Sequence, residues 1–233
     1  MPSVAAYDAL APLYSTLMER RKQYLKAVES IIVAHAQGAR SLLDVGAGTG
    51  VRSLKIANAC GIEHMVLIEP SNGMRSEAPV STAIWKHTIT ETSGTTKYDL
   101  ITLLWNVLGH LSGLHERVFL LSKLRGLLNP SGVLFLDVNH RYNAISYGWT
   151  KTACRLLGDH LFPSEDKGDV LTSWQVGDKR ISTRGHVFTH RELVDLFRRA
   201  DLKLRARWII DYRNGAQHRF SLFGNLLYQL TVE

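Results

Sequence analysis

Cysteine is scarce in this chain of 233 residues, which contains only Cys60 and Cys154. Two cysteines so far apart in the sequence exclude a disulfide framework and a cysteine-based metal site, so we expect two reduced thiols. Histidine does not replace them as a metal ligand. His186 and His190 are four residues apart, but Thr189 is expected to begin a helix between them, so they cannot share one helical face. The sequence predicts no metal site.

Long hydrophobic runs are missing as well. No apolar stretch approaches the roughly 18 to 20 residues that span a bilayer, and residues 1–7 lack the basic start and apolar stretch of a signal peptide. We therefore expect a cytoplasmic protein without a membrane partner. No linker rich in Pro, Gly or Ser divides the chain, and with 45% hydrophobic residues it can bury one continuous core. The sequence predicts a single domain.

Blocks of like charge are also absent. The chain has 28 Lys and Arg against 21 Asp and Glu, which gives a net charge of +7, and the excess lies mostly in residues 141–233. Such a balance fits a nucleic-acid partner, an acidic small substrate, or solubility alone. Because the chain has no arginine-rich tail, we do not favour a nucleic-acid partner.

Short apolar runs alternate with helical stretches between residues 41 and 138. Nearly continuous apolar strands in this alternation predict a parallel sheet with helices on both faces, whose ligands bind beyond the carboxyl ends of the strands. A turn at 129–132, with a Pro and a Gly, is expected between the last helix and the last strand. The expected strands are 41–45, 65–68, 83–86, 99–104 and 133–138, and the expected helices are 51–60 and 114–128.

The flanking segments have other patterns. Residues 7–36 have helical character, and after the fifth strand 170–176 and 180–186 are expected to form a hairpin around the Gly-Asp pair at 177–178. The Thr and Glu at 189 and 192 have the spacing of a capping box, which begins a helix. The expected last elements are strands at 202–211 and 220–232.

The most informative stretch joins the first expected strand to the first helix and reads Asp-Val-Gly-Ala-Gly-Thr-Gly at 44–50. A glycine-rich turn there lets the backbone approach a ligand and points the helix N-terminus at an anionic group. A dinucleotide site would need its third glycine where Val51 stands, and the Gly-Lys-Ser/Thr of a phosphate loop is absent. Glu69 ends the next strand, where it can accept hydrogen bonds from both ribose hydroxyls. The pattern predicts a nucleoside ligand with an anionic group, and not necessarily a pyrophosphate.

These motifs resemble those of the class I S-adenosylmethionine-dependent methyltransferases, and the resemblance covers almost the whole chain. Residues 69–74 look like the acid-x-Ser-x-x-Met pattern of that family, 98–101 are similar to its fourth strand, and 127–132 to the turn before its fifth. One departure lies at 87–91, where relatives often carry an Asp that meets the adenine amino group.

The resemblance implies an α/β, Rossmann-like fold. Its seven-stranded sheet would be mostly parallel, with an antiparallel last strand, helices on both faces and a small β insertion after strand five. We divide the single domain into an N-terminal helical lid (1–40), a cofactor-binding core (41–138), a substrate-side insertion (139–188), and a C-terminal helix with a strand pair (189–233).

The resemblance also implies S-adenosyl-L-methionine as the cofactor, with S-adenosyl-L-homocysteine as its product. Glu69 would hold the ribose and Met74 would pack on the adenine, although simple core packing explains Met74 almost as well. Asp44 has a second interpretation, in which its carboxylate fixes the loop by accepting backbone N–H hydrogen bonds. The cofactor residues that we predict are Asp44, Gly46, Ala47, Gly48, Gly50, Glu69, Pro70, Ser71, Met74, Thr88, Leu104, Asn106 and, in the lid, Tyr14.

Methyl transfer from a sulfonium is an in-line displacement, so alignment matters more than acid and base chemistry. An amine or hydroxyl acceptor still needs a base, and histidine suits neutral pH best. His110 follows the fourth strand and is the expected base, with a purely structural role equally compatible. For Arg141 the alternative is a salt bridge, and for the aromatic residues it is core packing. The substrate residues that we predict are His110, Asn139, Arg141, Tyr142, Tyr147 and Trp174.

We therefore expect a methyltransferase that acts on an oxygen or nitrogen of a small-molecule metabolite, as a monomer or homodimer. An RNA or protein methyltransferase is the second hypothesis, although the Asn-Pro-Pro-Tyr type of tetrapeptide and a separate RNA-binding module are missing. A non-catalytic, cofactor-binding regulator is the third hypothesis.

Overall fold

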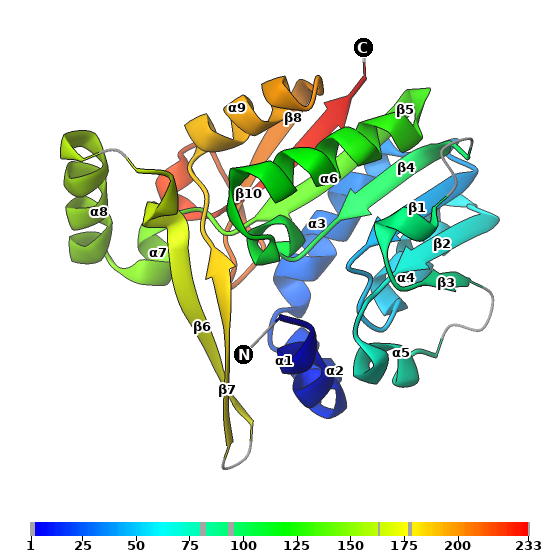
Figure 1. The fold of residues 1–233 in the computed structure, drawn as a ribbon, viewed down its shortest axis with the longest axis horizontal. Helices are drawn as coiled ribbons and strands as arrows, with labels where there is room; N and C mark the ends of the chain where they lie inside the picture. Colours follow the sequence, from blue (N-terminus) through cyan, green and yellow to red (C-terminus); the bar gives the residue numbers. More distant parts are fainter. Residues whose placement is uncertain (1–2, 80–82, 93–95, 163, 177–178, 233) are drawn as a thin grey trace.

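A computed structural model describes residues 3–79, 83–92, 96–162, 164–176 and 179–232. Its centre is an eight-stranded sheet in the order β3-β2-β1-β4-β5-β10-β8-β9 (Figure 1). Strands β3, β2, β1, β4 and β5 are parallel, and β10 is antiparallel to both β5 and β8. The parallel strands are β1 (Ser41–Val45), β2 (His64–Ile68), β3 (Ile84–Lys86), β4 (Tyr98–Leu103) and β5 (Leu128–Val138), followed by β8 (Lys203–Ile210), β9 (Gln217–His218) and β10 (Asn225–Thr231).

This sheet confirms the expected Rossmann-like architecture, with two differences. The two-residue strand β9 is an eighth strand, and it is too short to produce a recognisable sequence pattern. The turn expected at 129–132 lies inside β5, because Tyr98 pairs with Leu128 and Leu100 pairs with Val133. The extra residues on β5 form an irregularity in the strand, so Pro and Gly mark a break in pairing here rather than the strand's start.

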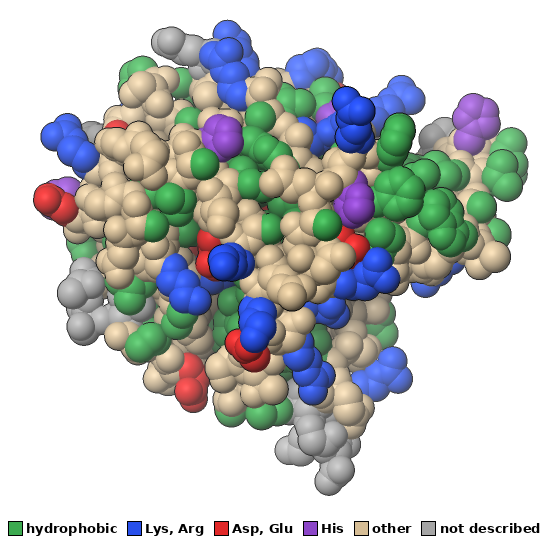
Figure 2. Space-filling model, turned by 180° about the vertical axis from the view of Figure 1, so that it is seen from behind, with side chains coloured by type: hydrophobic (Ala, Val, Ile, Leu, Met, Phe, Trp, Pro, Cys, Tyr) green, Lys and Arg blue, Asp and Glu red, His purple; other side chains and the backbone are tan. Residues whose placement is uncertain are grey.

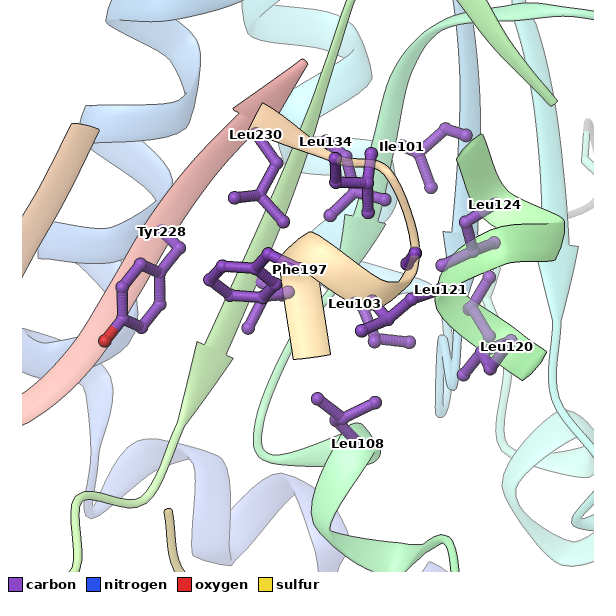
Figure 3. Packing of buried hydrophobic residues seen from close by; sticks show 14 of the residues in the cluster. Ile101, Leu103, Leu108, Leu120, Leu121, Leu124, Leu134, Phe197, Tyr228 and Leu230 are labelled. Carbon is purple, nitrogen blue, oxygen red and sulfur yellow. The ribbon is translucent and has the colours of Figure 1, made fainter. Parts of the chain in front are cut away.

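Helices cover both faces of the sheet. Helices α6 (Gly113–Leu127) and α9 (His190–Arg199) lie on one face, where Leu120, Leu121, Leu124 and Phe197 pack on apolar side chains of β4, β5 and β10 (Figure 3). Helices α3 (Lys22–His35) and α4 (Val51–Cys60) pack on the other face. Two separate buried clusters, one on each side, therefore fix the sheet and the loops at its carboxyl edge.

The N-terminal segment is helical. It consists of α1 (Ser3–Leu10), the 3₁₀ turn η1 (Ala11–Leu13), α2 (Tyr14–Glu19) and α3. Helix α1 contacts α5 (Asn72–Ser76), which follows β2, and also β7 (Lys179–His186) of the insertion. It therefore bridges the sheet's carboxyl edge and the insertion.

The insertion contains helices as well as strands. The expected hairpin is confirmed as β6 (Asp169–Val176) paired with β7, and the Gly-Asp pair of its turn lies outside the described residues. Helices α7 (Ala144–Tyr147) and α8 (Trp149–Leu161) precede it, which the expectation of a small β insertion omits. Figure 2 shows hydrophobic side chains gathered on the protruding end that α8 forms, and Trp149, Leu157 and Leu161 are all exposed. Because these apolar residues face outward, the usual buried helical pattern does not reveal α8.

Candidate active site

The glycine-rich turn between β1 and α4 folds as its composition requires. Gly46, Gly48 and Gly50 have φ values of 74°, 60° and 74°, which L side chains rarely adopt. A Cβ at Gly48 would lie 3.2 Å from both Met74 Cε and Tyr14 Oη. Because Gly48 has no Cβ, the backbone of the turn lies close to side chains of α5 and α2.

Asp44, in the strand before this turn, is hydrogen-bonded to neighbouring elements. Its carboxylate accepts hydrogen bonds from Ser53 Oγ at 2.5 Å and from Thr102 Oγ1 at 2.7 Å, which ties β1 to α4 and β4. Burial raises the pKa of Asp44, and the two hydroxyls oppose that rise. Asp44 thus connects the strand before the turn with the helix after it, through the hydroxyl of Ser53.

Glu69, at the end of β2, faces the same turn. Its Oε2 accepts a hydrogen bond from the Gly48 N–H at 2.9 Å, and its Oε1 accepts one from the Ser71 N–H at 2.8 Å. Burial raises the pKa of Glu69, and these two N–H groups oppose the rise. Each carboxylate oxygen has a second lone pair, so Glu69 can still accept hydrogen bonds from a diol.

Short helix α5 positions the remaining part of the motif. Ser71 is its N-cap, and the Ser71 Oγ accepts a hydrogen bond from the Met74 N–H at 3.1 Å. Met74 is buried and turned toward Gly48. The Ser71 Oγ also donates to Asp8 Oδ1 at 2.6 Å, and Asp8 accepts a second hydrogen bond from the Gly73 N–H at 2.9 Å. One carboxylate of α1 thus holds α5.

These elements enclose a cavity of about 350 Å³ at the carboxyl edge of the sheet. The structure brings together in its wall nine of the predicted site residues, namely Tyr14, Gly46, Gly48, Glu69, Pro70, Met74, Thr88, Leu104 and His110. Asp44, Ala47, Gly50, Ser71 and Asn106 do not line it. Asn106 instead donates from Nδ2 to the His186 carbonyl at 3.2 Å and accepts at Oδ1 from the Asn139 N–H at 3.0 Å.

His110 ends the 3₁₀ turn η3 (Val107–His110), which follows β4. Its Nε2 lies 3.0 Å from the Tyr7 hydroxyl of α1, and the two rings meet edge to face. Burial lowers the pKa of His110, and the Arg184 backbone opposes that fall. The imidazole is therefore neutral at pH 7, which is the form that accepts a proton.

The other predicted substrate residues lie outside this wall. Arg141 makes two hydrogen bonds to Asp159 of α8, at 2.5 and 2.8 Å, and the Tyr142 hydroxyl donates to the same carboxylate at 2.8 Å. Tyr147 packs under the Arg155 guanidinium. The Asn139 Oδ1 accepts a hydrogen bond from Asn225 Nδ2 at 2.9 Å, and Trp174 packs on Tyr7 at a ring distance of 6.0 Å. Within the part of the chain that the structure describes, Trp174 is the member of this set that packs on a residue of the cavity wall, Tyr7.

Tyr7 and Trp105 line the cavity, although the sequence does not single them out for it. Trp105 has a φ of 64°, and its ring lies 5.6 Å from that of Tyr14. Tyr7 reaches His110 across 103 residues of chain. The sequence could have indicated Trp105 as a wall residue, because it follows β4 almost directly. Nothing local in the sequence indicates the contact between Tyr7 and His110.

Neither a metal site nor a membrane-spanning helix is found among the described residues. No three His, Cys, Asp or Glu side chains are grouped so that they could hold a metal ion. Within the same ranges, every helix is too short or too polar to cross a membrane.

A mostly parallel sheet with a glycine-rich turn and an acidic residue directly after β2 is typical of nucleoside-binding α/β proteins. The family model described as "Methyltransferase domain" matches residues 15–207. The chain belongs to this family and to the class I S-adenosylmethionine-dependent methyltransferases.

Individual relatives agree with this assignment. A putative methyltransferase from Geobacillus sp. (strain WCH70) is 28% identical over 145 residues, which cover 59% of this chain and 53% of that protein. The chain therefore spans about half the length of this curated relative. Two solved structures share the fold. One is a complex of the Haloferax volcanii Trm112 methyltransferase activator with a putative methyltransferase (TM-score 0.67, 16% identity, covering 98% of this chain and 96% of that one). The other is S-adenosylmethionine-bound CalS10, an amino pentose methyltransferase from Micromonospora echinaspora (TM-score 0.62, 17% identity, 95% and 97%).

Proposed function

We propose that this chain transfers a methyl group from S-adenosyl-L-methionine to an oxygen or nitrogen of a small-molecule metabolite. The observation that carries the proposal is one cavity in which bare glycine backbone, the Glu69 carboxylate and Met74 meet. These residues fit an adenosyl ligand, because the carboxylate can accept from a ribose diol and a Cβ on Gly48 would crowd Met74 and Tyr14. The bound group supplies an electrophilic methyl on a sulfonium.

The side chains around the cavity suit this chemistry. Leu104, Val107, Ile89 and Leu120 make much of its wall apolar, which keeps water away from the sulfonium charge that disappears during transfer. His110 would accept the proton of an acceptor hydroxyl or ammonium group. Helix α1 would act as the lid, since its residues Val4 and Tyr7 close one side of the cavity. A cavity of about 350 Å³ favours a compact acceptor.

The first test is calorimetric titration with S-adenosylmethionine and S-adenosylhomocysteine. We expect Glu69→Ala and Gly48→Val each to weaken binding at least about tenfold, the former by removing a buried acceptor and the latter by filling the turn at a φ of 60°. Glu63→Ala, on an exposed carboxylate, and Gly126→Val, where a Cβ meets nothing within 4 Å, are the matched controls. Unchanged binding in both site variants would contradict this site.

The acceptor needs a separate experiment. A metabolite extract incubated with the protein and a methyl-labelled donor should yield a labelled small molecule by mass spectrometry. Label recovered only in RNA or protein would reject the small-molecule acceptor, and cofactor binding without turnover on any acceptor would favour a regulator.

A further inference from the structure

Helix α8 is attached to the rest of the molecule by its polar side. Asp159 accepts hydrogen bonds from Arg141 Nε at 2.5 Å and from the Tyr142 hydroxyl at 2.8 Å. Arg155 Nη1 donates to the Arg141 carbonyl at 2.9 Å, and Thr152 on the same side of the helix is buried. A surface helix usually buries its apolar side instead, so the orientation of α8 is inverted.

The opposite side of α8 is apolar and exposed (Figure 2). Its residues recur every three or four positions, which places them in one stripe along the helix. Beyond the helix, the Phe223 ring lies 5.9 Å from that of Trp149 and 6.4 Å from that of Phe220. We call this surface the α8 patch, and it consists of Trp149, Ala153, Leu156, Leu157, Leu161, Phe220 and Phe223.

The α8 patch is large enough for a stable interface. Trp149, its three leucines and Phe220 are 42% to 68% exposed, which at roughly 150 to 250 Å² for a whole large side chain leaves about 600 Å² of apolar surface. Monomeric proteins rarely expose a contiguous apolar patch of more than a few hundred Å². A standard interface covers about 800 Å² of each partner, of which a little over half is apolar. The patch therefore supplies the apolar area that a dimer needs.

We propose that a second copy of this chain covers the α8 patch, with the two α8 helices antiparallel. Such a contact uses the same surface on both copies. The two stripes overlap over their whole length when the two-fold axis passes next to residue 155, midway between 149 and 161. Trp149 then faces Leu161 of the other copy, and Ala153 faces Leu157. Because a small side chain lies opposite a large one, the two helices can pack closely.

An anionic lipid surface is the main alternative occupant. A helix that lies on such a surface needs basic side chains along its polar face, where they can reach the head groups. The Lys and Arg residues of α8 are Lys151 and Arg155, and Arg155 is turned inward, over the Tyr147 ring. The protein itself already occupies the polar face of α8, which favours a second copy over lipid.

Sedimentation equilibrium of the full chain tests the dimer. We expect the unmodified protein to be dimeric at micromolar concentration. Leu157→Glu should raise the dimer dissociation constant at least about a hundredfold, because each dimer would bury two unpaired carboxylates. Phe119→Glu places the same charge on an exposed site of α6, where the original side chain is 55% exposed, and should leave the dimer intact. Circular dichroism checks that each variant is folded.

A mixing experiment tests the antiparallel pairing. Ala153→Lys and Leu157→Glu should each abolish the dimer when present alone. An equimolar mixture of the two variants should form a heterodimer, because the new lysine of one copy would lie beside the new carboxylate of the other. A mixture that stays monomeric would overturn this pairing.

Three further results would overturn the proposal as a whole. They are a monomeric unmodified protein, a dimer that Leu157→Glu leaves intact, and a monomer that sediments with phosphatidylglycerol vesicles and loses this binding in Leu157→Glu. The last result would assign the α8 patch to a lipid surface.

Discussion

Individual side chains at the carboxyl edge of the sheet make different contacts with the glycine-rich turn. Asp44 holds the turn, Glu69 faces it, and Met74 fills the space beside Gly48. His110 differs from these three because it is hydrogen-bonded to Tyr7 of α1. The proposed base is thus a neutral imidazole where η3 meets α1.

Replacing His110 tests its role as a base. We expect His110→Ala to lower kcat at least about tenfold, since general-base catalysis contributes roughly a hundredfold or more. Burial lowers the pKa of His110. In the unmodified protein, the apparent pKa of the acid limb of the kcat–pH profile should therefore lie below the usual histidine value. This limb should be absent from the profile of the variant. Steady-state rates measured across a range of pH give both kcat and the position of its acid limb. His115→Ala, on an exposed histidine of α6, is the control, and an unaltered rate in His110→Ala would return the residue to a structural role.

More of the predicted cofactor residues than of the predicted substrate residues line the cavity, for a physical reason. A glycine turn, an acid two residues before it and an acid ending the next strand are fixed by local backbone geometry, so spacing reveals them. Arg141 and Tyr142 lie shortly after β5, but their partner Asp159 lies on α8, which no local sequence pattern predicts. Their role toward a substrate stays a prediction.

Short elements in this protein depend on contacts with other elements. Helix α1 has eight residues, which is too few for a stable isolated helix. Ala6 and Leu10 are its buried residues, and they pack with Ile181 of β7. One of its polar attachments is Asp8, which accepts hydrogen bonds from Ser71 and Gly73. Helix α1 is therefore held by a small apolar cluster, the carboxylate of Asp8 and the hydrogen bond between Tyr7 and His110.

Loss of that carboxylate should release α1. In Asp8→Ala we expect amide hydrogens of α1 to exchange at least about tenfold faster, because local opening follows the loss of tertiary contacts. Amides of α3, which packs on the sheet, are the internal control and should keep their protection. Hydrogen exchange read by mass spectrometry makes the comparison. Equal protection of α1 before and after the change would show that its other contacts hold the helix without Asp8.

At the scale of the whole molecule, the insertion is attached to the sheet through a buried polar junction. His140 follows β5, its backbone forms a bridge with Phe188, and its Nδ1 lies 2.9 Å from the Ser221 carbonyl, to which it donates. Asn225 of β10 contacts both Asn139 and Asn143 in the same junction. Segments far apart in the sequence meet here, so no motif predicts the junction, although the polar residues after β5 mark its position.

This junction should make folding stability depend on pH. Burial lowers the pKa of His140 to about 4, and the Ser221 carbonyl opposes that fall, whereas the unfolded chain titrates near its usual value of 6.5. Between these values the unfolded state binds more protons, so the stabilisation is complete above pH 6.5 and is lost as the pH falls toward 4. We expect His140 to account for a loss of about 2 kcal/mol between pH 8 and pH 5. Buried Asp44 and Asp137, whose pKa values are raised, act in the opposite direction, so the total curve mixes both effects. The difference between the unmodified protein and His140→Gln in urea unfolding at the two pH values isolates the histidine, and parallel curves would show that His140 is protonated equally in the folded and unfolded states.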